Sequence, residues 1–481
     1  MNNKKENIGN YRWTVCGLLF FATTINYLDR QVLSLTWSDF IAPEFHWTNN
    51  DYGNITALFS IFYAVSLLFA GRFVDWLDTK KGFLWAIGIW SIGACLHAFC
   101  GIATSGIITG NWFVGFDGAK KIIASINDTG MVINVSVTLF IFARFVLALG
   151  EAGNFPAAIK TTAEYFPKKD RAFSTSIFNA GATVGALAAP ITIPFIAKAF
   201  GWEMAFIIIG ALGFVWMGFW VFMYDKPEKH PKVSSAELTY IQQDDIADSQ
   251  LVGYIPETST KVSLKQCLKY RQTWAFIFGK FMTDGVWWFF LFWTPAYLSS
   301  VYGMNATQAA FPLFVLYMIT LLSIIGGWLP TYFVEKKEMD PYAGRMRSML
   351  IFAFFPLLTL VAQPLGHITY WLPVIIIGIA GAAHQAWSAN IFTTVGDMFP
   401  KKAIATITGI GGLAGGIGST VINKSSGLLF DFSEKTNMDF MGFHGIEAGY
   451  FIIFSICAVC YLIGWSIMKI LVPKYSPITD L

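Results

Sequence analysis

Charged side chains interrupt several long apolar stretches of this sequence, where an ionised group is costly and usually serves function. The first stretch contains an adjacent acid and base, Asp29 and Arg30, and a later one contains Arg144 and Glu151. Seven residues make nearly two helical turns, so Arg144 and Glu151 would share one face about 10 Å apart. A carboxyl group that can hold a proton beside an arginine that can hold an anion suits proton-coupled movement of an organic anion.

The chemistry of Glu151 depends on two opposing effects. Burial disfavours a charged carboxylate, whereas a neighbouring arginine favours it. Glu151 could therefore gain or lose a proton as an anion engages Arg144. The alternatives are a purely structural pair for Arg144 and Glu151, and snorkelling of Asp29 and Arg30 to the membrane surface.

A second group of polar side chains lies in the last third of the chain. Lys280 and Asp284 are four residues apart and would share a helix face. Lys280 is either a second cation for an anionic ligand or a snorkelling lysine. His384 is either a ligand-binding or a packing histidine, and the residues that follow it offer a stacking surface and hydrogen bonds of the kind a sugar needs: Trp387, Ser388 and Asn390.

The elements that position these residues must be membrane helices. Hydrophobic residues make up 55% of the 481 residues, charged residues only 13%, and the mean hydropathy is +0.53. A soluble protein carries about twice that share of charge, and a spanning helix needs roughly 20 apolar residues. The sequence predicts an all-α membrane protein with twelve spans near 12–36, 54–74, 83–106, 132–158, 172–198, 203–224, 272–298, 307–333, 347–363, 370–394, 403–423 and 447–471.

A charged stretch over 225–271 divides the spans six and six. It predicts an N-terminal bundle over 1–224 and a C-terminal bundle over 272–481, joined by a linker. With both termini and the linker on the cytoplasmic side of a bacterial inner membrane, most lysines and arginines fall on that side, as the positive-inside rule requires. The other side receives only Lys120, Lys121, Lys198, Lys424 and Lys435.

A short repeat supports duplication of the two halves. Phe166-Pro167-Lys168-Lys169 recurs as 399–402, 233 residues later and at the corresponding place in the second half. Parallel repeats of six spans are an architecture of secondary transporters. The same offset carries Glu151 onto His384, so the two residues are predicted to face each other across a central cavity.

The remaining composition argues against several other functions. The net charge of +3 suggests no nucleic-acid partner. Cys457 and Cys460 lie in an apolar helix without a neighbouring histidine or acid, so packed thiols are expected there. Neither a metal ion nor a cofactor is expected.

At this point the residues resemble the major facilitator superfamily. The loop over 71–82 resembles its G-x-x-x-D-R-x-G-R-R signature, which gates the carrier; the matching positions are Gly71, Asp75, Lys80 and Lys81. Trp76 and Asp78 stand where the signature has Arg and Gly, which leaves the gating contact of that arginine open.

Within the superfamily the chain is similar to the anion:cation symporters, and to their hexuronate branch. The first likeness rests on 27–30, on Arg144 with 150–157, and on Phe166-Pro167; the second rests on 158–167, 280–293 and 384–390. One departure is the long stretch from about 106 to 130, which the resemblance does not explain.

The resemblance implies roles for individual residues. Asp29 and Glu151 match the acids that take the coupling protons, and Arg30 matches the arginine that holds the substrate carboxylate. Arg144 matches the arginine that pairs with the acids, and Tyr63 a tyrosine that faces the substrate. Placement adds further expected substrate contacts: Asn179, Lys280, His384, Trp387, Ser388 and Asn390.

The expected function is proton-coupled symport of a hexuronate, glucuronate or galacturonate, by a monomer that alternates access to the two sides. Another organic anion, such as an aldonate or an aromatic carboxylate, remains an alternative substrate. A membrane-embedded enzyme acting on a lipid-linked sugar would need clustered acids or a metal motif, which the sequence lacks. A channel would show flux without saturation.

Overall fold

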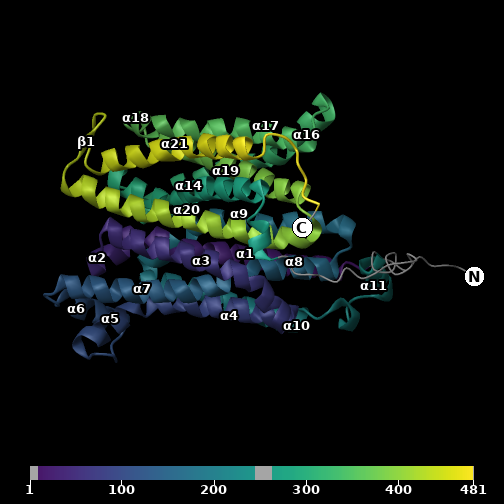
Figure 1. Ribbon diagram of the computed structural model, residues 1–481. Helices are drawn as coiled ribbons and strands as arrows, with labels where there is room; N and C mark the ends of the chain where they lie inside the picture. The colour runs from purple at the N-terminus through teal and green to yellow at the C-terminus, as the bar shows by residue number, and fades with distance from the viewer. Residues whose placement is uncertain (1–8, 244–262, 480–481) are drawn as a thin grey trace, which may run out of the picture.

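Long helices lying side by side make up nearly all of the computed structural model, which describes residues 9–243 and 263–479 (Figure 1). The N-terminal half consists of α1 (Tyr11–Thr36), α3 (Asn49–Leu77), α4 (Thr79–Ala98) with α5 (Cys100–Thr109), α7 (Thr129–Glu151) with α8 (Asn154–Tyr165), α9 (Lys168–Phe200) and α10 (Trp202–Met223). The C-terminal half consists of α14 (Arg271–Tyr302), α15 (Ala306–Thr320) with α16 (Ile325–Lys337), α17 (Pro341–Phe354) with α18 (Ala362–Gly366), α19 (Trp371–Met398), α20 (Lys401–Lys435) and α21 (Ile446–Leu471). The predicted all-α fold with two six-helix bundles is confirmed.

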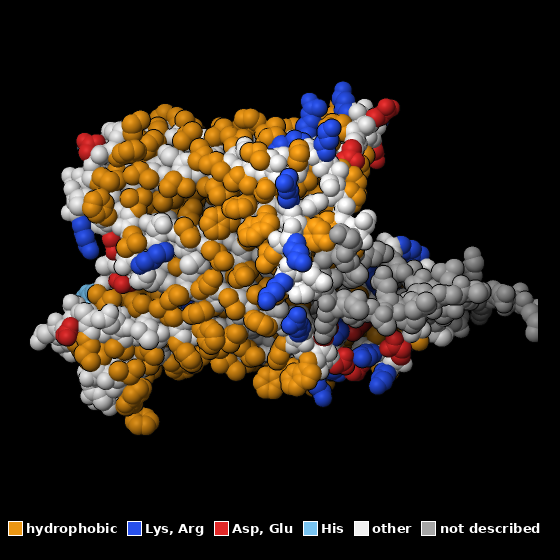
Figure 2. Space-filling view, in the orientation of Figure 1, with side chains coloured by type: hydrophobic (Ala, Val, Ile, Leu, Met, Phe, Trp, Pro, Cys, Tyr) orange, Lys and Arg blue, Asp and Glu red, His pale blue; other side chains and the backbone are white. Residues whose placement is uncertain are grey.

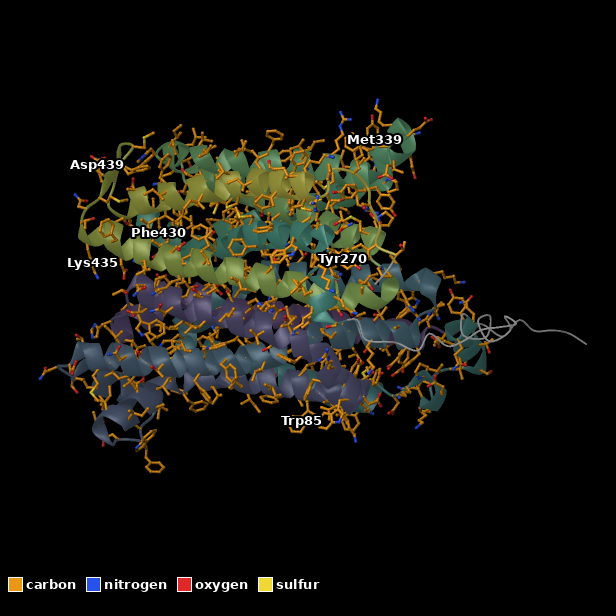
Figure 3. The ribbon with its side chains drawn as sticks, viewed as in Figure 1. Trp85, Tyr270, Met339, Phe430, Lys435 and Asp439 are labelled. Carbon is orange, nitrogen blue, oxygen red and sulfur yellow. The ribbon has the colours of Figure 1, made fainter. Side chains whose placement is uncertain are left out.

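Short elements connect these helices. They are η1 (Trp37–Ile41), α2 (Ala42–Phe45), α6 (Phe116–Ala124), η2 (Pro227–Lys229), α11 (Ser235–Ile241), α13 (Leu264–Cys267), η3 (Leu321–Ile324), η4 (Phe355–Val361) and the hairpin β1 (Asp439–Phe440) and β2 (Phe443–His444). Helix α1 begins, α10 ends and α14 begins at the same end of the molecule, which is called the linker end. The other end, where Figure 3 labels Lys435 and Asp439, is called the opposite end.

Apolar length explains most of the helices. Among the described residues, nine helices are long and apolar enough to cross a membrane, and the pair α4 and α5, bent by 56°, makes a tenth. The predicted span 83–106 is therefore a broken helix and not a straight one. Helices α1 and α20 are not among these apolar spans. The first contains Asp29 and Arg30, and the second is rich in glycine, serine and threonine.

The surface agrees with a membrane setting. Figure 2 shows hydrophobic side chains covering the middle of the molecule, with Lys and Arg side chains gathered at the linker end. Apolar atoms facing lipid need no polar partner, whereas charged groups need water or headgroups. The protein is a multi-pass membrane protein.

The two halves meet along three helix pairs: α3 with α20, α1 with α14, and α9 with α15. Close approach of α3 and α20 depends on small residues. A Cβ atom on Gly53 would lie 3.1 Å from the Cα atom of Gly427, and one on Gly416 would overlap the side chain of Ala64. Small residues let membrane helices pack backbone to backbone.

At the opposite end, each half caps a helix of the other. The carboxylate of Asp431 in α20 accepts hydrogen bonds from the backbone N–H groups of Asn49 (2.8 Å) and Asn50 (3.1 Å) in the first turn of α3. Reciprocally, Asp39 accepts from the backbone N–H of Ala306, the first residue of α15. The first N–H groups of a helix lack partners within it, and a carboxylate there is favourable. These two reciprocal caps hold the halves together at the opposite end.

We expect Asp431→Asn to loosen this closure. An amide satisfies two backbone N–H groups less well than a carboxylate, and loss of such a cap costs about 1 kcal/mol. In a cysteine-free background, a reporter cysteine at Ala57, which is buried between α3 and α20, should react about fivefold faster with a water-soluble maleimide. Asp439→Asn, an exposed acid of β1, serves as the control; an unchanged labelling rate in Asp431→Asn would show that the caps do not hold this end closed.

The linker begins as part of the N-terminal half. The buried carboxylate of Glu237 in α11 accepts hydrogen bonds from the backbone N–H and the Nη1 of Arg12, at 3.0 and 3.2 Å. This ion pair ties α11 to the start of α1. The rest of the linker prediction, over 244–262, lies outside the described residues.

Candidate functional site

The centre of the site is a buried ion pair between α1 and α7. Arg30 donates from Nε and Nη2 to the Oε2 atom of Glu151, at 3.0 and 2.7 Å. The two side chains are 4% and 0% exposed. Charge-assisted bonds of this kind are strong. Breaking a buried pair by removing one partner leaves an uncompensated charge, so the two side chains depend on each other.

Three aromatic rings surround the guanidinium group of Arg30. Its Cζ atom lies 4.6 Å from the ring centre of Tyr63, 5.2 Å from that of Tyr27 and 5.0 Å from that of Trp288. Tyr27 and Tyr63 belong to the N-terminal half, whereas Trp288 comes from α14 in the C-terminal half. Sequence reasoning named Tyr63 but gave Trp288 no role; the only signal was the Trp287-Trp288 pair inside a stretch with a buried charge.

Asp29 and Arg144 are buried close to the Arg30–Glu151 pair, but neither takes part in it. Both carboxylate oxygens of Asp29, and the Nε and Nη1 atoms of Arg144, have no hydrogen-bond partner among the described residues. The Cζ atom of Arg144 lies 5.0 Å from the ring centre of Phe59. A buried polar atom without a partner is costly, so Asp29 and Arg144 are held in the site at a cost in stability.

The spacing of Arg144 and Glu151 suggested a pair along one helix, but Glu151 reaches across to α1 instead. Helix α7 ends at Glu151, and α8 begins at Asn154. Gly150 lies against the backbone of α4 at Trp90 and Ala86, and Gly153 lies against the side chain of Ala86, so a Cβ atom at either glycine would overlap α4. A side chain at either glycine would therefore disturb the packing against α4 beside Glu151.

A second charged pair lies in the C-terminal half. Lys280 and Asp284 form an ion pair of 2.7 Å along one face of α14, with side chains 6% and 15% exposed. The ammonium group also lies 4.3 Å from the ring centre of Phe392 in α19. Lys280 is therefore neutralised by its own helix in this structure.

His384 is engaged within the C-terminal half as well. Its Nδ1 atom is 2.7 Å from the hydroxyl of Tyr461, and its ring stacks on Trp287 at 5.3 Å. Trp387 is fully buried and meets the ring of Tyr461 edge to face at 5.6 Å. These rings join α14, α19 and α21 next to Lys280.

Three of the expected substrate contacts make no hydrogen bond to the charged groups among the described residues. Asn390 donates to the carbonyl oxygens of Gly326 (2.9 Å) and Ala386 (2.8 Å), which fixes α16 against α19. Asn179 is exposed on α9 and Ser388 is half-buried on α19. In the described part of the chain, neither side chain makes a hydrogen bond to the two charged pairs.

The stretch expected as a gating loop over 71–82 is almost entirely helical, because α3 runs to Leu77 and α4 begins at Thr79. Gly71 lies on α3 itself, and Lys81 is exposed on the first turn of α4. Asp75 pairs with Lys160 of α8 at 3.0 Å, and Lys80 pairs with Asp225 at 2.8 Å.

The two departures from the signature have visible consequences. Trp76 is 80% exposed, so it does not take over a buried contact of the arginine it replaces. Asp78 has φ of 70°, which explains why glycine suits this position. The carboxylate of Asp78 pairs with Lys226 at 3.2 Å.

The unexplained stretch over 106–130 forms a lobe at the opposite end, with α6 as its core (Figure 1). Lys120 of α6 pairs with Glu203 of α10 at 2.9 Å, and the neighbouring Trp202 donates from Nε1 to Glu44 Oε2 at 2.8 Å. Burial raises the pKa of Glu44 to about 7, although the hydrogen bond from Trp202 lowers it. The lobe is thus fastened to α10 beside a carboxyl group that titrates near neutrality.

We expect Glu44→Gln to stabilise the protein in mildly alkaline solution. The pKa of Glu44 is raised from 4.5 to about 7, so folding favours the neutral form and stability falls as pH rises through this range. Glutamine removes a penalty of roughly 3 kcal/mol above pH 7. Melting temperatures in detergent should be higher for Glu44→Gln at pH 8 and equal to the parent at pH 4.5; a difference that is independent of pH would contradict this account.

Comparison with known proteins gives a consistent family. The family model described as the Major Facilitator Superfamily matches residues 19–422. Among solved structures, a bacterial homologue of the human lysosomal transporter Spinster, inward-facing and unoccupied, superposes with a TM-score of 0.69 at 18% identity, covering 98% of this chain and 100% of that one. At this identity the likeness concerns the fold.

Several relatives with curated names are named for sugar acids. The "Hexuronate transporter" of Escherichia coli strain K12 is 27% identical over 470 residues, 96% of this chain and 95% of the relative. The "Galacturonate transporter" of Dickeya chrysanthemi is 27% identical over 70% of this chain and 87% of its own length. The "Probable galactarate/D-glucarate transporter GarP" of E. coli K12 is 24% identical, covering 96% of each chain.

Proposed function

Because this chain belongs to the Major Facilitator Superfamily, and is a transporter and not an enzyme, we propose that it carries a hexuronate, glucuronate or galacturonate, into the cell together with a proton. The single observation that carries the proposal is the buried pair of Arg30 and Glu151, with Asp29 and Arg144 beside it. Relatives named for hexuronate and galacturonate support the choice of substrate.

Competition for Arg30 provides the coupling. While Glu151 is ionised, it occupies the Nε and Nη2 edge of the guanidinium group. A proton on Glu151 removes that charge and frees the edge for the planar, bidentate binding of a substrate carboxylate. Asp29 is the other acid that we assign to proton coupling, and Arg144 attracts the anion and steadies the acids during the cycle.

The second charged group receives the sugar. Lys280, His384 and Trp387 line one side of the proposed site from the C-terminal half, and Tyr63 lies on the side of Arg30. Ser388, Asn390 and Asn179 are assigned weaker roles, because Asn390 already fixes α16 and the other two make no hydrogen bond to the charged pairs in the described part of the chain. We keep the gating role for Asp75 and Lys80, now with Lys160 as the partner of Asp75.

The transport cycle follows from the arrangement of the halves. We assign the linker end to the cytoplasm and the opposite end to the periplasm of a bacterial inner membrane, with bundles over 1–224 and 272–481 joined by the linker over 225–271. The lysines and arginines at the linker end support this orientation. The reciprocal caps close the periplasmic end, and rocking of the bundles of a monomer alternates access.

Uptake of labelled glucuronate and galacturonate into proteoliposomes, with and without an inward proton gradient, tests the function. Accumulation that requires the gradient supports proton-coupled hexuronate transport. Unlabelled glucarate, galactonate and an aromatic carboxylate are added as competitors, because related carriers are named for galactarate and D-glucarate. No uptake of either hexuronate by folded, inserted protein, with uptake of labelled glucarate, galactonate or aromatic carboxylate instead, would replace the substrate but keep the carrier.

A further inference from the structure

Trp288 is the one ring around Arg30, among the described residues, that belongs to the other half of the molecule. Its ring centre lies 5.0 Å from the Cζ atom of Arg30 and 6.0 Å from the ring of Tyr63. The neighbouring rings of Phe59 and Phe292 hold it at 6.2 and 5.2 Å. The contact between Arg30 and Trp288 therefore joins the two halves at the centre of the site, far from the caps of the opposite end.

The strength of this contact depends on what else binds Arg30. A cation is attracted to the face of an aromatic ring by electrostatics, and the attraction grows when the cation is desolvated. A carboxylate on the guanidinium edge cancels much of its field at the ring. The ring is therefore held most tightly when Arg30 is buried and has no carboxylate partner.

Arg30 stays positively charged throughout the proposed cycle, on which this inference rests, but its counter-charge differs among three states. With Glu151 ionised, the pair is neutral, as in this structure. With Glu151 protonated and substrate bound, the substrate carboxylate compensates Arg30. With Glu151 protonated and no substrate, Arg30 carries an uncompensated charge, and movement of this form across the membrane would carry a proton without substrate.

We propose that Trp288 is a positioning residue that clamps the two halves through the uncompensated guanidinium group of Arg30 and so prevents protons from leaking through the empty carrier. Tyr27 and Tyr63 cannot do this, because they lie in the same half as Arg30 and move with it. In the two compensated forms the halves are free to move, because Arg30 then holds the ring of Trp288 less tightly. Trp288 thereby makes proton movement conditional on the anion.

Proton entry into proteoliposomes without substrate tests this role. Vesicles contain a trapped pH-sensitive dye, the membrane voltage is clamped with potassium and valinomycin, and an inward proton gradient is imposed. The parent should leak little, Trp288→Leu should admit protons about tenfold faster, corresponding to about 1.4 kcal/mol, and Trp288→Phe should stay near the parent. Trp274→Leu, at the exposed linker end of the same helix, is the matched control.

Further arms keep the outcome decisive. Trp288→Met fills a similar length without an aromatic face and replaces the leucine variant if that one misfolds. A purely structural role would lower leak and transport together, whereas the clamp predicts a higher leak with exchange of glucuronate retained. Folded Trp288→Leu or Trp288→Met that is as proton-tight as the parent overturns the inference. Absence of substrate-dependent proton entry in the parent would instead overturn the proposed function.

Discussion

Arg30→Ala should abolish binding of glucuronate. The substrate carboxylate loses its bidentate partner in a buried site, and removing one member of a buried, hydrogen-bonded charge pair costs about 3 kcal/mol or more, at least a hundredfold in affinity. Equilibrium binding of labelled glucuronate to purified protein measures the effect. Arg30→Lys should bind at an intermediate level, because it keeps the charge but loses the planar fork.

The alanine variant needs a control for the charge it leaves behind. Without Arg30, ionised Glu151 is buried and unpaired, which destabilises the site by itself. The double variant Arg30→Ala with Glu151→Gln removes that charge and should be folded but still unable to bind. Normal binding by this double variant would place the carboxylate elsewhere, with Arg144 the first candidate.

Glu151→Gln should separate exchange from accumulation. Glutamine resembles the protonated acid, so Arg30 stays free for the substrate and bound sugar acid can exchange across the membrane. The variant cannot return a proton, so an inward proton gradient should no longer drive accumulation, a loss of at least tenfold in the steady-state level relative to the parent.

Counterflow and gradient-driven uptake in the same proteoliposome preparation distinguish the two activities. Glu447→Gln, a partly exposed acid that faces His367 at the start of α21, is the control and should behave as the parent in both assays. Full accumulation by Glu151→Gln would remove Glu151 from the coupling and leave Asp29 to carry the proton.

The sequence predicted the fold because hydropathy records burial in lipid directly. Each helix of a membrane bundle must satisfy its backbone internally and present apolar side chains outward, so the spans could be located from hydropathy. Their ends were less well predicted: the span expected over 403–423 continues to Lys435, and the one expected over 132–158 runs across the end of α7 at Glu151. The break between α4 and α5 was missed because both sides of Phe99 are apolar. Hydropathy does not record the direction of a helix axis.

The sequence also predicted which residues form the buried charged cluster, but not which of them pair with each other. Asp29, Arg30, Arg144 and Glu151 stand out as charges in apolar runs, and all four are buried. Spacing along one helix suggested a pair between Arg144 and Glu151, whereas the structure pairs Glu151 with Arg30 across two helices. Periodicity reports neighbours within a helix, and contacts between helices depend on packing.

The repeat offset illustrates the same limit in the second half. It related Glu151 to His384, yet His384 is hydrogen-bonded to Tyr461 and stacked on Trp287. Pseudo-symmetry relates positions of the backbone, whereas the partners of a side chain follow from local sequence. Trp288 could not be assigned a role for this reason, because its significance arises only from the position of Arg30 in the other half.

The two buried charge groups also determine how membrane voltage acts on the protein. Asp29, Glu151 and Asp284 balance Arg30, Arg144 and Lys280, so with all six ionised the groups sum to zero. A membrane potential of 100 mV changes the free energy by about 2.3 kcal/mol for each elementary charge that crosses the membrane. The empty, fully ionised carrier would therefore reorient without sensing the field. Only the loaded step would respond, in proportion to the number of protons minus the one substrate charge, and the voltage dependence of uptake would count the protons.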